Sequence, residues 1–283
     1  MLRVRCPAFT AAVAKVRTKA TVDPLRVASC LAPHLCWFYR FLADCLGDRV
    51  GRTAEFIEDA SYEQLGEMDI VFVCSLAYVD HASIRRRFEP IAAPVLAGAR
   101  YDSRPVYYSD VIVRHDSPLR SFADLRGRTW AYNEKRSQSG YGITRYHLAR
   151  LGETGGYFGQ LIEAGRHEGA MALVASGEVD AAAIDSHTLE TYLDLHPHLG
   201  RALRIIDSLG PSPIQPVAVR RSLSRECKDD FRSALAGINK DPEARSCLAR
   251  AQVERFVRVD EETYDPVLTM SAFAAAAGLS VLK

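Results

Sequence analysis

The feature that most constrains the fold is a repeated alternation of short apolar segments with amphipathic helical segments. The clearest apolar segment is 69–73, Asp-Ile-Val-Phe-Val, which is typical of a strand buried on both faces. Strands that alternate with helices line up in a mainly parallel sheet, with the helices on its faces. The sequence therefore predicts an α/β protein.

The alternation divides into two units. Strands are expected at 25–29, 53–57, 69–73, 105–113, 129–132, 161–164, 179–184, 204–207 and 216–219. Helices are expected at 35–46 (ending at Gly47), 62–65, 81–88, 121–125, 139–151, 168–176 and 188–195, and throughout the chain after 219. We expect residues 23–103 and 210–283 to form one lobe, with a second lobe, 104–209, inserted through two hinge crossings. The ligand cleft of such an architecture lies between the lobes.

Composition limits the function further. The 283 residues are enough for two lobes that each have a core. The formal net charge of +1 creates no overall field that would attract nucleic acid or a membrane surface. No segment is long and apolar enough to span a bilayer. We therefore expect no nucleic-acid partner and no membrane insertion, and an anionic ligand must be held by local groups.

The N-terminus and the cysteines bear on the compartment. Residues 1–22 are a basic arm without an acidic residue, and they lack the uninterrupted apolar stretch of a secretory signal. Residues 27–30, Val-Ala-Ser-Cys, match a lipoprotein cleavage box but fit a core strand better. The seven cysteines include no Cys-x-x-Cys pair, and their odd number fits a reducing compartment. These features favour the cytoplasm, and the spacing of His and Cys predicts no metal and no cofactor.

The most informative segment is 133–141, Asn-Glu-Lys-Arg-Ser-Gln-Ser-Gly-Tyr, which follows a strand and opens a helix. A helix N-terminus presents unsatisfied backbone N–H groups and partial positive charge. The hydroxyls of Ser137 and Ser139, with the close approach that Gly140 permits, would suit a tetrahedral oxyanion. The alternative is ordinary capping of the helix by a serine, which is the better interpretation of this segment alone.

Two further strand-to-helix turns carry polar residues. His167, in the turn 165–167, can donate a hydrogen bond to an anion, although a single turn histidine is more often a surface or capping residue. Asp185 ends an apolar strand, where doubly wound folds place ligand residues. The alternative for Asp185 is an N-cap of the following helix.

In their order along the chain, these segments resemble the substrate-binding proteins of phosphonate ABC importers. The shared features are the tyrosine-rich strand 107–113, Asp-Ser-Pro at 116–118, Asp-Leu-Arg-Gly at 124–127, the serine segment 137–141, Gly-Arg-His at 165–167, Gly-Glu-Val-Asp-Ala-Ala at 177–182 and Tyr-Asp-Pro-Val at 264–267. The resemblance covers about 25–270 and implies a two-lobed periplasmic-binding-protein fold of type II. It changes the preferred interpretation of 133–141 from a cap to an anion site.

The resemblance also implies roles for individual residues. The phosphoryl oxygens would be bound by Ser137, Gln138 and Ser139 and by the backbone amides of Gly140 and Tyr141. His167 would donate to the same group from the facing turn. Tyr78, or the strand end at 74–75, would close the pocket from the first lobe.

The ligand is expected to lack a cationic tail. Family members that bind aminoalkyl phosphonates place acids around the amine, and the matching positions here are His187 and Gln215. Neither is a carboxylate. A phosphonate, phosphite or phosphate without an amine therefore fits better.

Two classes of function remain open at this point. The favoured one is a binding protein, not an enzyme, that delivers the oxyanion to the membrane subunits of an importer. The alternative is a cytoplasmic enzyme or anion sensor on the same fold. The sequence shows no convincing nucleophile–base pair, which argues against catalysis.

Overall fold

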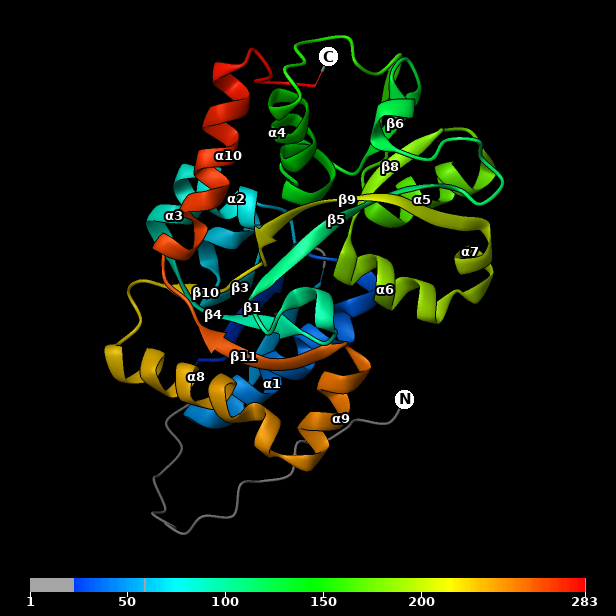
Figure 1. Ribbon diagram of the computed structural model, residues 1–283. Helices are drawn as coiled ribbons and strands as arrows, with labels where there is room; N and C mark the ends of the chain where they lie inside the picture. Colours follow the sequence, from blue (N-terminus) through cyan, green and yellow to red (C-terminus); the bar gives the residue numbers. More distant parts are fainter. Residues whose placement is uncertain (1–22, 59, 283) are drawn as a thin grey trace, which may run out of the picture.

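The computed structural model describes residues 23–58 and 60–282 and shows two α/β lobes, each built on one sheet (Figure 1). The expected basic arm, 1–22, lies outside the described residues. Of the helices in the described part of the chain, none combines the length and the apolar character needed to cross a membrane.

The first lobe contains a six-stranded sheet in the order β11–β4–β10–β3–β1–β2. Its strands are β1 (Leu25–Ser29), β2 (Ala54–Ile57), β3 (Ile70–Phe72), β4 (Phe88–Leu96), β10 (Val217–Arg220) and β11 (Val253–Arg258). β1 pairs in parallel with β2 and β3, whereas β10 runs antiparallel to β3 and β4, and β11 antiparallel to β4.

The second lobe contains a five-stranded sheet in the order β7–β6–β8–β5–β9. Its strands are β5 (Val106–Arg114), β6 (Thr129–Tyr132), β7 (Gln160–Glu163), β8 (Ala181–Asp185) and β9 (Leu203–Pro213). β6 is parallel to β7 and β8, and β5 is antiparallel to β8 and β9. Both sheets are mixed, because β10 and β11 run against the other four strands of the first sheet and β5 runs against the other four strands of the second. Most strands of each sheet still run in one direction, as expected.

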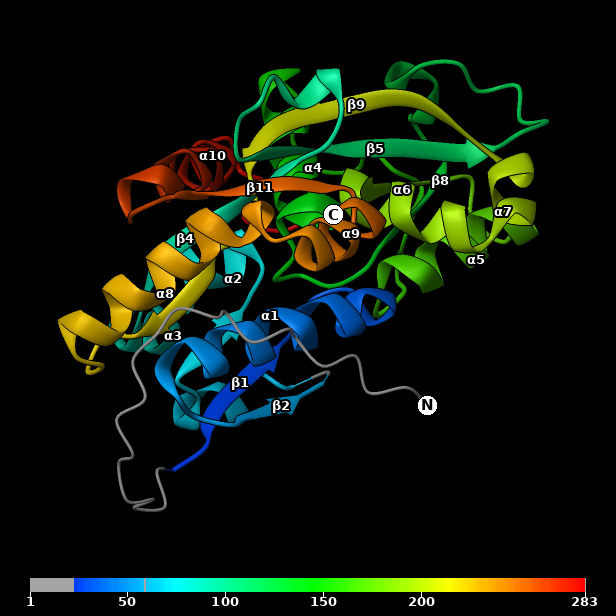
Figure 2. The same cartoon turned by 90° about the horizontal axis from the view of Figure 1, so that it is seen from below.

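The chain crosses between the lobes twice, between β4 and β5 and between β9 and β10. β5 and β9 are paired along most of their length and lie side by side in both views (Figures 1 and 2). The expected proline-rich crossing at 211–216 is shorter than predicted, because β9 continues to Pro213. This ladder joins the two crossings into one hinge region.

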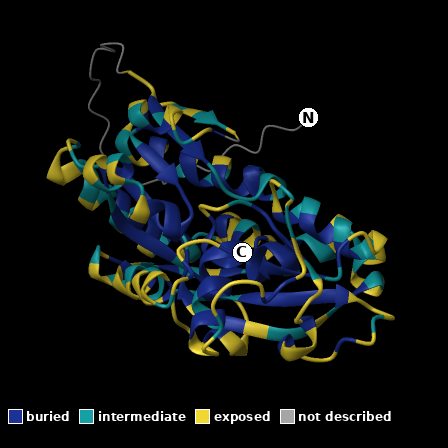
Figure 3. Ribbon diagram, turned by 90° about the horizontal axis from the view of Figure 1, so that it is seen from above, coloured by how far each residue is buried: buried dark blue, intermediate teal, exposed yellow. Residues whose placement is uncertain are grey.

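Helices flank both sheets, and in the second lobe they cover both faces of the sheet. They are α1 (Cys36–Val50), α2 (Ser75–Asp80), α3 (Ala82–Arg87), α4 (Ile143–Arg150), α5 (His167–Ser176), α6 (Ser186–Leu195), α7 (Pro197–Ala202), α8 (Arg225–Gly237), α9 (Pro242–Arg250) and α10 (Asp265–Ala276). Figure 3 shows buried strands in the interior and exposed residues mainly on helices and loops. The sheets and the inner faces of the helices therefore supply the cores.

The C-terminal helix α10 connects the two lobes. Ala274 lies in the same buried cluster as Val111 and Trp130 of the second lobe, and Leu279 and Leu282 join it. The backbone oxygen of Leu279 accepts a hydrogen bond from the Arg145 guanidinium at 2.7 Å. The end of the segment 210–283, assigned to the first lobe from the sequence, therefore packs on the second.

Several boundaries differ from the expectations for identifiable reasons. The first helix continues past Gly47 to Val50, and Gly51 follows it in the left-handed region at φ 70°. Gly47 does not end the helix but is needed for packing, because a Cβ there would lie 2.6 Å from the backbone oxygen of Arg52. The expected helix 81–88 corresponds to α3, which covers Ala82–Arg87, and Phe88 already begins β4.

Two strands were missed. The predicted helical region after 219 contains β11, and β4 was not recognised at all. β4 includes Pro90 and Pro94, which cannot donate to a ladder and argue against a central strand in a sequence. The structure accommodates Pro90 beside a shift in register between β4 and β10.

Candidate functional site

A cavity of about 370 Å³ lies between the two lobes. The first lobe lines it with residues 30–33, Tyr39, 60–63, Cys74 and Gln215. The second lobe lines it with Asn133, Glu134, Ser137, Ser139, 165–168, Asp185, His187 and Thr188. The cavity is thus built from residues of both lobes, as the interlobe-cleft architecture predicts.

The lining residues cluster at the carboxyl ends of strands. Cys30 follows β1 and Cys74 lies two residues after β3, while Asp185 is the last residue of β8. The serine loop, residues 133–139, follows β6, and the turn 164–166 follows β7. Because parallel strands in each sheet end at the same edge, turns distant in sequence meet around one cavity.

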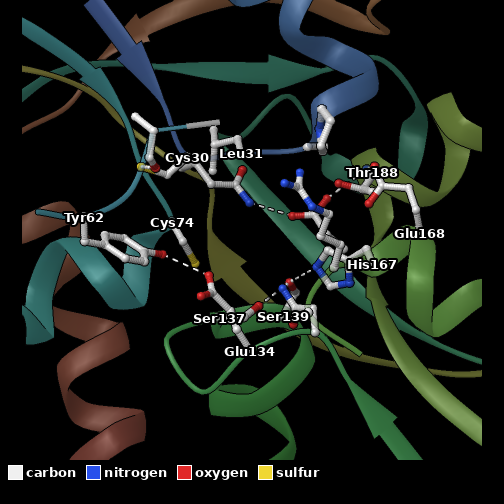
Figure 4. Close-up of a pocket in the computed structure, with 18 of the residues that line it drawn as sticks. Cys30, Leu31, Tyr62, Cys74, Glu134, Ser137, Ser139, His167, Glu168 and Thr188 are labelled. Atoms are coloured by element: carbon white, nitrogen blue, oxygen red, sulfur yellow. Dashed lines mark hydrogen bonds between the residues drawn. The ribbon is translucent and has the colours of Figure 1, made fainter. Parts of the chain in front are cut away.

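The serine loop leads into a π-helical turn, Gln138–Gly142, that continues as α4. The Oγ atoms of Ser137 and Ser139 are 3.2 Å apart, and both side chains are buried at the cavity wall (Figure 4). Ser137 Oγ accepts a hydrogen bond from the backbone N–H of Gly140 at 3.1 Å. The capping interpretation of Ser137 is therefore confirmed, and the cap lies beside the cavity.

Gly140 is required by close packing at this turn. A Cβ at position 140 would lie 2.1 Å from Asn133 Oδ1 and 3.2 Å from the Asn133 backbone nitrogen. Asn133 Oδ1 is buried and has no hydrogen-bond partner among the described residues. The glycine thus lets the helix start approach the strand end and keeps a polar atom at the cavity wall.

His167 faces the serines from the first position of α5. Its Nε2 lies 2.9 Å from Ser139 Oγ, and the ring is buried (Figure 4). Burial lowers the pKa of His167 more than the nearby Asp185 and Glu168 raise it, which favours the neutral ring. Its Nδ1 is buried and has no partner among the described residues. The structure therefore brings Ser137, Ser139 and His167 together, as the sequence predicted.

Asp185 performs the capping role that the sequence offered as an alternative. Its Oδ1 accepts from the Thr188 backbone N–H at 3.0 Å. Its Oδ2 accepts from the Gln215 amide at 2.6 Å, which joins the second lobe to the return crossing. Both side chains also line the cavity.

His187 lines the cavity but donates elsewhere. Its Nε2 lies 2.6 Å from the backbone oxygen of Ala251, which belongs to the first lobe. Burial lowers the pKa of His187, so the neutral ring with a proton on Nε2 fits this contact. This histidine therefore holds the lobes together in addition to lining the pocket.

The side chains of three predicted site residues, Tyr78, Gln138 and Tyr141, point away from the cavity; of Tyr141, only the backbone amide was expected to bind. Tyr78 is buried in α2 against Tyr264, with ring centroids 5.4 Å apart, and is not part of the cavity lining. The Gln138 amide donates to Ser212 Oγ at 3.2 Å, and Tyr141 OH accepts from the Leu282 N–H at 3.0 Å. Since α2 turns Tyr78 into the core, Cys74, the alternative at the strand end, is the group that reaches the pocket from this segment.

The sequence did not reveal the polar residues at the cavity mouth. Tyr62 OH donates to Glu134 at 3.0 Å across the cleft, and Glu168 lies 3.0 Å from the His34 ring (Figure 4 labels Tyr62, Glu134 and Glu168). Burial raises the pKa of Glu134 despite the Tyr62 hydrogen bond. In the sequence, Glu134 and Glu168 were marked only by their positions in or next to expected site segments. Their contacts were not predictable, because the partners Tyr62 and His34 belong to the other lobe.

Comparisons with known proteins agree with this geometry. Residues 38–264 match the family model described as "ABC transporter, phosphonate, periplasmic substrate-binding protein". The phosphonates-binding periplasmic protein of Escherichia coli is 26% identical over 187 residues, which are 64% of this chain and 55% of that protein. The chain thus matches only about half the length of this curated relative.

Solved structures share the fold. A binding protein component of an ABC phosphonate transporter from Pseudomonas aeruginosa superposes with a TM-score of 0.78 at 21% identity, covering 92% of this chain and 89% of that one. PhnD1 from Prochlorococcus marinus, solved in complex with methylphosphonate, gives a TM-score of 0.74 at 18% identity, covering 88% and 97%. The expected two-lobed fold of type II is therefore confirmed.

The family match bears on two questions that the sequence left open. It describes substrate-binding proteins and not enzymes, and it describes them as periplasmic, so the preference for the cytoplasm drawn from the cysteines is not supported. The recognition of the family from its ordered motifs is confirmed, because the matched region covers most of the chain. This chain belongs to the family of periplasmic substrate-binding proteins of phosphonate ABC transporters.

Proposed function

We propose that the interlobe cavity binds a small phosphonate and that the protein presents it in the periplasm to the membrane subunits of an ABC importer. The observation that carries the proposal is the convergence of Ser137 Oγ, Ser139 Oγ and the His167 ring on one wall of the cavity. Hydroxyl and imidazole groups at the start of a helix suit the oxygens of a tetrahedral anion. The family match and the fold support the same function.

The carboxylates of the cavity favour a ligand without an ammonium group. Asp185 already accepts from Gln215 and Thr188. Glu134 accepts from Tyr62, and Glu168 contacts His34. Because these three carboxylates are each engaged by a donor of the protein, an ammonium would have to share their oxygens with those donors. Methylphosphonate is therefore a better ligand for this cavity than 2-aminoethylphosphonate.

The chemistry of the cavity also favours binding over catalysis. Burial raises the pKa of the Cys74 thiol to about 11, which keeps it protonated and unreactive at neutral pH. Ser139 and His167 form a serine–histidine pair, but His167 Nδ1 has no orienting acceptor among the described residues. A serine nucleophile normally needs such a third group.

Isothermal titration calorimetry tests the proposal with four probes: methylphosphonate, 2-aminoethylphosphonate, phosphate and sulfate. We expect methylphosphonate to bind at least about tenfold more tightly than 2-aminoethylphosphonate, which corresponds to about 1.4 kcal/mol. Tighter binding of the aminoalkyl compound would refute the argument from the carboxylates. A lack of heat with all four ligands would refute the proposed function.

A further inference from the structure

A histidine outside the cavity lining bridges the two lobes. His34 lies in the short helix Pro33–Leu35 of the first lobe, and its side chain is 8% exposed. Its Nδ1 is 3.0 Å from Glu168 Oε1 of α5, and its Nε2 is 2.9 Å from Thr191 Oγ1 of α6. We call these three side chains the interlobe clasp. Glu168 lines the cavity, so the clasp is attached to the ligand site.

The hydrogen bonds of Thr191 fix the proton on one ring nitrogen. Thr191 Oγ1 lies 2.6 Å from the backbone oxygen of His187, which can only accept. The single hydroxyl proton of Thr191 is therefore directed to that carbonyl. Thr191 Oγ1 must then accept a hydrogen bond from His34, so Nε2 carries a proton.

The second ring nitrogen faces a carboxylate. Burial raises the pKa of Glu168, but the His34 hydrogen bond and the α5 backbone lower it by more, so Glu168 is ionised. A neutral His34 with its proton on Nε2 would turn the Nδ1 lone pair toward this carboxylate, which is a contact between two acceptors. Both contacts are satisfied together only when the ring is an imidazolium with a proton on each nitrogen.

We propose that His34 is a positioning residue of the phosphonate site: as an imidazolium it clasps Glu168 and Thr191 and holds the lobes closed around the ligand. This inference rests on the proposed function. His34 does not itself line the cavity, so its effect on the ligand is exerted through closure. Binding should consequently tighten as the pH falls through the range in which histidines gain a proton.

Other charged groups surround the clasp. His167 on α5 and His187 on α6 are both close enough to His34 for its positive charge to lower their pKa values. Asp185 at the start of α6 acts on both rings in the opposite direction. The phosphonate titrates alike with wild type and variant, so a ratio of affinities removes its contribution. Any change in the His167 and His187 pKa values follows from the loss of the His34 charge and is part of the effect that the ratio measures.

The test measures the methylphosphonate Kd by calorimetry at pH 6, 7 and 8 for wild type and His34→Gln. We expect the Kd of the variant to exceed that of wild type by about tenfold at pH 6, because a charge-assisted bridge is lost, with the ratio falling toward one at pH 8. His115→Gln, an exposed histidine beyond β5, is the control and should give a ratio of one throughout. A ratio for His34→Gln that is one, or that does not change with pH, would overturn the proposal.

Glu168→Gln provides a second readout. The amide can donate to Nδ1, so a neutral His34 then satisfies both contacts. The ratio of this variant's Kd to the wild-type Kd should fall as the pH rises, and an unchanged ratio would count against the ionic clasp. If wild type binds none of the four probes, the proposed function fails, and small-angle scattering without ligand tests the clasp alone. Wild type should then be more compact than His34→Gln at pH 6 and equal to it at pH 8, and equal radii of gyration at both pH values would overturn the clasp.

Discussion

His167 Nε2 and Ser139 Oγ lie 2.9 Å apart, which joins the first turn of α5 to the serine loop at the wall of the cleft. The contact extends through Ser137 Oγ to the backbone N–H of Gly140. A chain of polar groups from two separate strand ends therefore faces one side of the cavity. An anion bound at this wall would either replace one of these hydrogen bonds or accept an additional one, because the groups already face the cavity.

Removing both serines should abolish ligand binding without unfolding the protein. Ser137→Ala with Ser139→Ala deletes the two hydroxyls at the cavity wall, and we expect no detectable heat with methylphosphonate. The lost N-cap should cost roughly 1 kcal/mol of unfolding free energy, which a two-lobed protein tolerates. Calorimetry measures the affinity, and urea denaturation measures the stability.

Ser224→Ala is the matched control for that double variant. Ser224 caps α8 by accepting from the Cys227 N–H at 3.2 Å, far from the cavity lining. Its loss should cost a similar amount of stability but leave the affinity unchanged. Unaltered affinity in the double serine variant would rule out the serine loop as the anion site.

His167 should act as a neutral hydrogen-bonding group. Because burial lowers its pKa, the ring stays neutral near pH 7, and His167→Ala should weaken methylphosphonate binding by about tenfold through the lost contact. The ratio of the His167→Gln Kd to the wild-type Kd should stay constant between pH 6 and 8. A ratio that rises steeply on acidification would mean that His167 binds the ligand as a cation.

Acid should destabilise the folded protein through its buried histidines. Burial lowers the pKa of His147, His167 and His187 from the ordinary value of 6.5. The unfolded chain therefore binds more protons than the folded one below about pH 6.5, so the free energy of unfolding falls as the pH falls. Urea denaturation at pH 7 and pH 5 measures this loss. His187→Gln keeps a donor for Ala251 and should show a smaller loss than wild type, and an equal loss would exclude His187 as a contributor.

Strands defined by local sequence were predicted from the sequence, whereas a strand defined by its tertiary pairing was not. The bounds of β1 and β6 were predicted correctly, because each is a short apolar run bounded by turn residues. β4 was missed because Pro90 and Pro94 contradict the local rules for a strand, and only pairing with β10 and β11 makes it one. Strand pairing across more than a hundred residues leaves no local periodicity to detect.

The same distinction applies to the site. The segments that carry Ser137, Ser139 and His167 were identified because their order along the chain is specific to a family. The contacts of Glu134 and Glu168 were not, since Tyr62 and His34 approach them from the other lobe. Tyr78 was misplaced because α2 turns its ring toward Tyr264 rather than into the cleft. Which residue of the other lobe a side chain contacts depends on the geometry of the hinge. No pattern within a single segment of sequence predicts that geometry.

The close approach at Gly140 should be sensitive to one methyl group. Gly140→Ala places a Cβ against both the side chain and the backbone of Asn133, so the start of the helix must shift. We expect a loss of about 1–3 kcal/mol in unfolding free energy and weaker methylphosphonate binding. Gly200→Ala in α7 is the control, because its Cβ would meet nothing within 4 Å and should leave both quantities unchanged or raise stability slightly. Wild-type affinity and stability in Gly140→Ala would show that the serine loop adjusts freely.

Tyr78 provides a direct test of where the pocket ends. Its hydroxyl is buried and has no hydrogen-bond partner among the described residues, and burial raises its pKa. Tyr78→Phe removes a polar group that is costly to bury, so the unfolding free energy should stay the same or rise by up to about 1 kcal/mol. Methylphosphonate affinity should not change, because the ring packs on Tyr264 outside the cavity lining. A drop in affinity with stability preserved would place Tyr78 at the ligand after all, and the cavity would then have to extend into the core between α2 and α10.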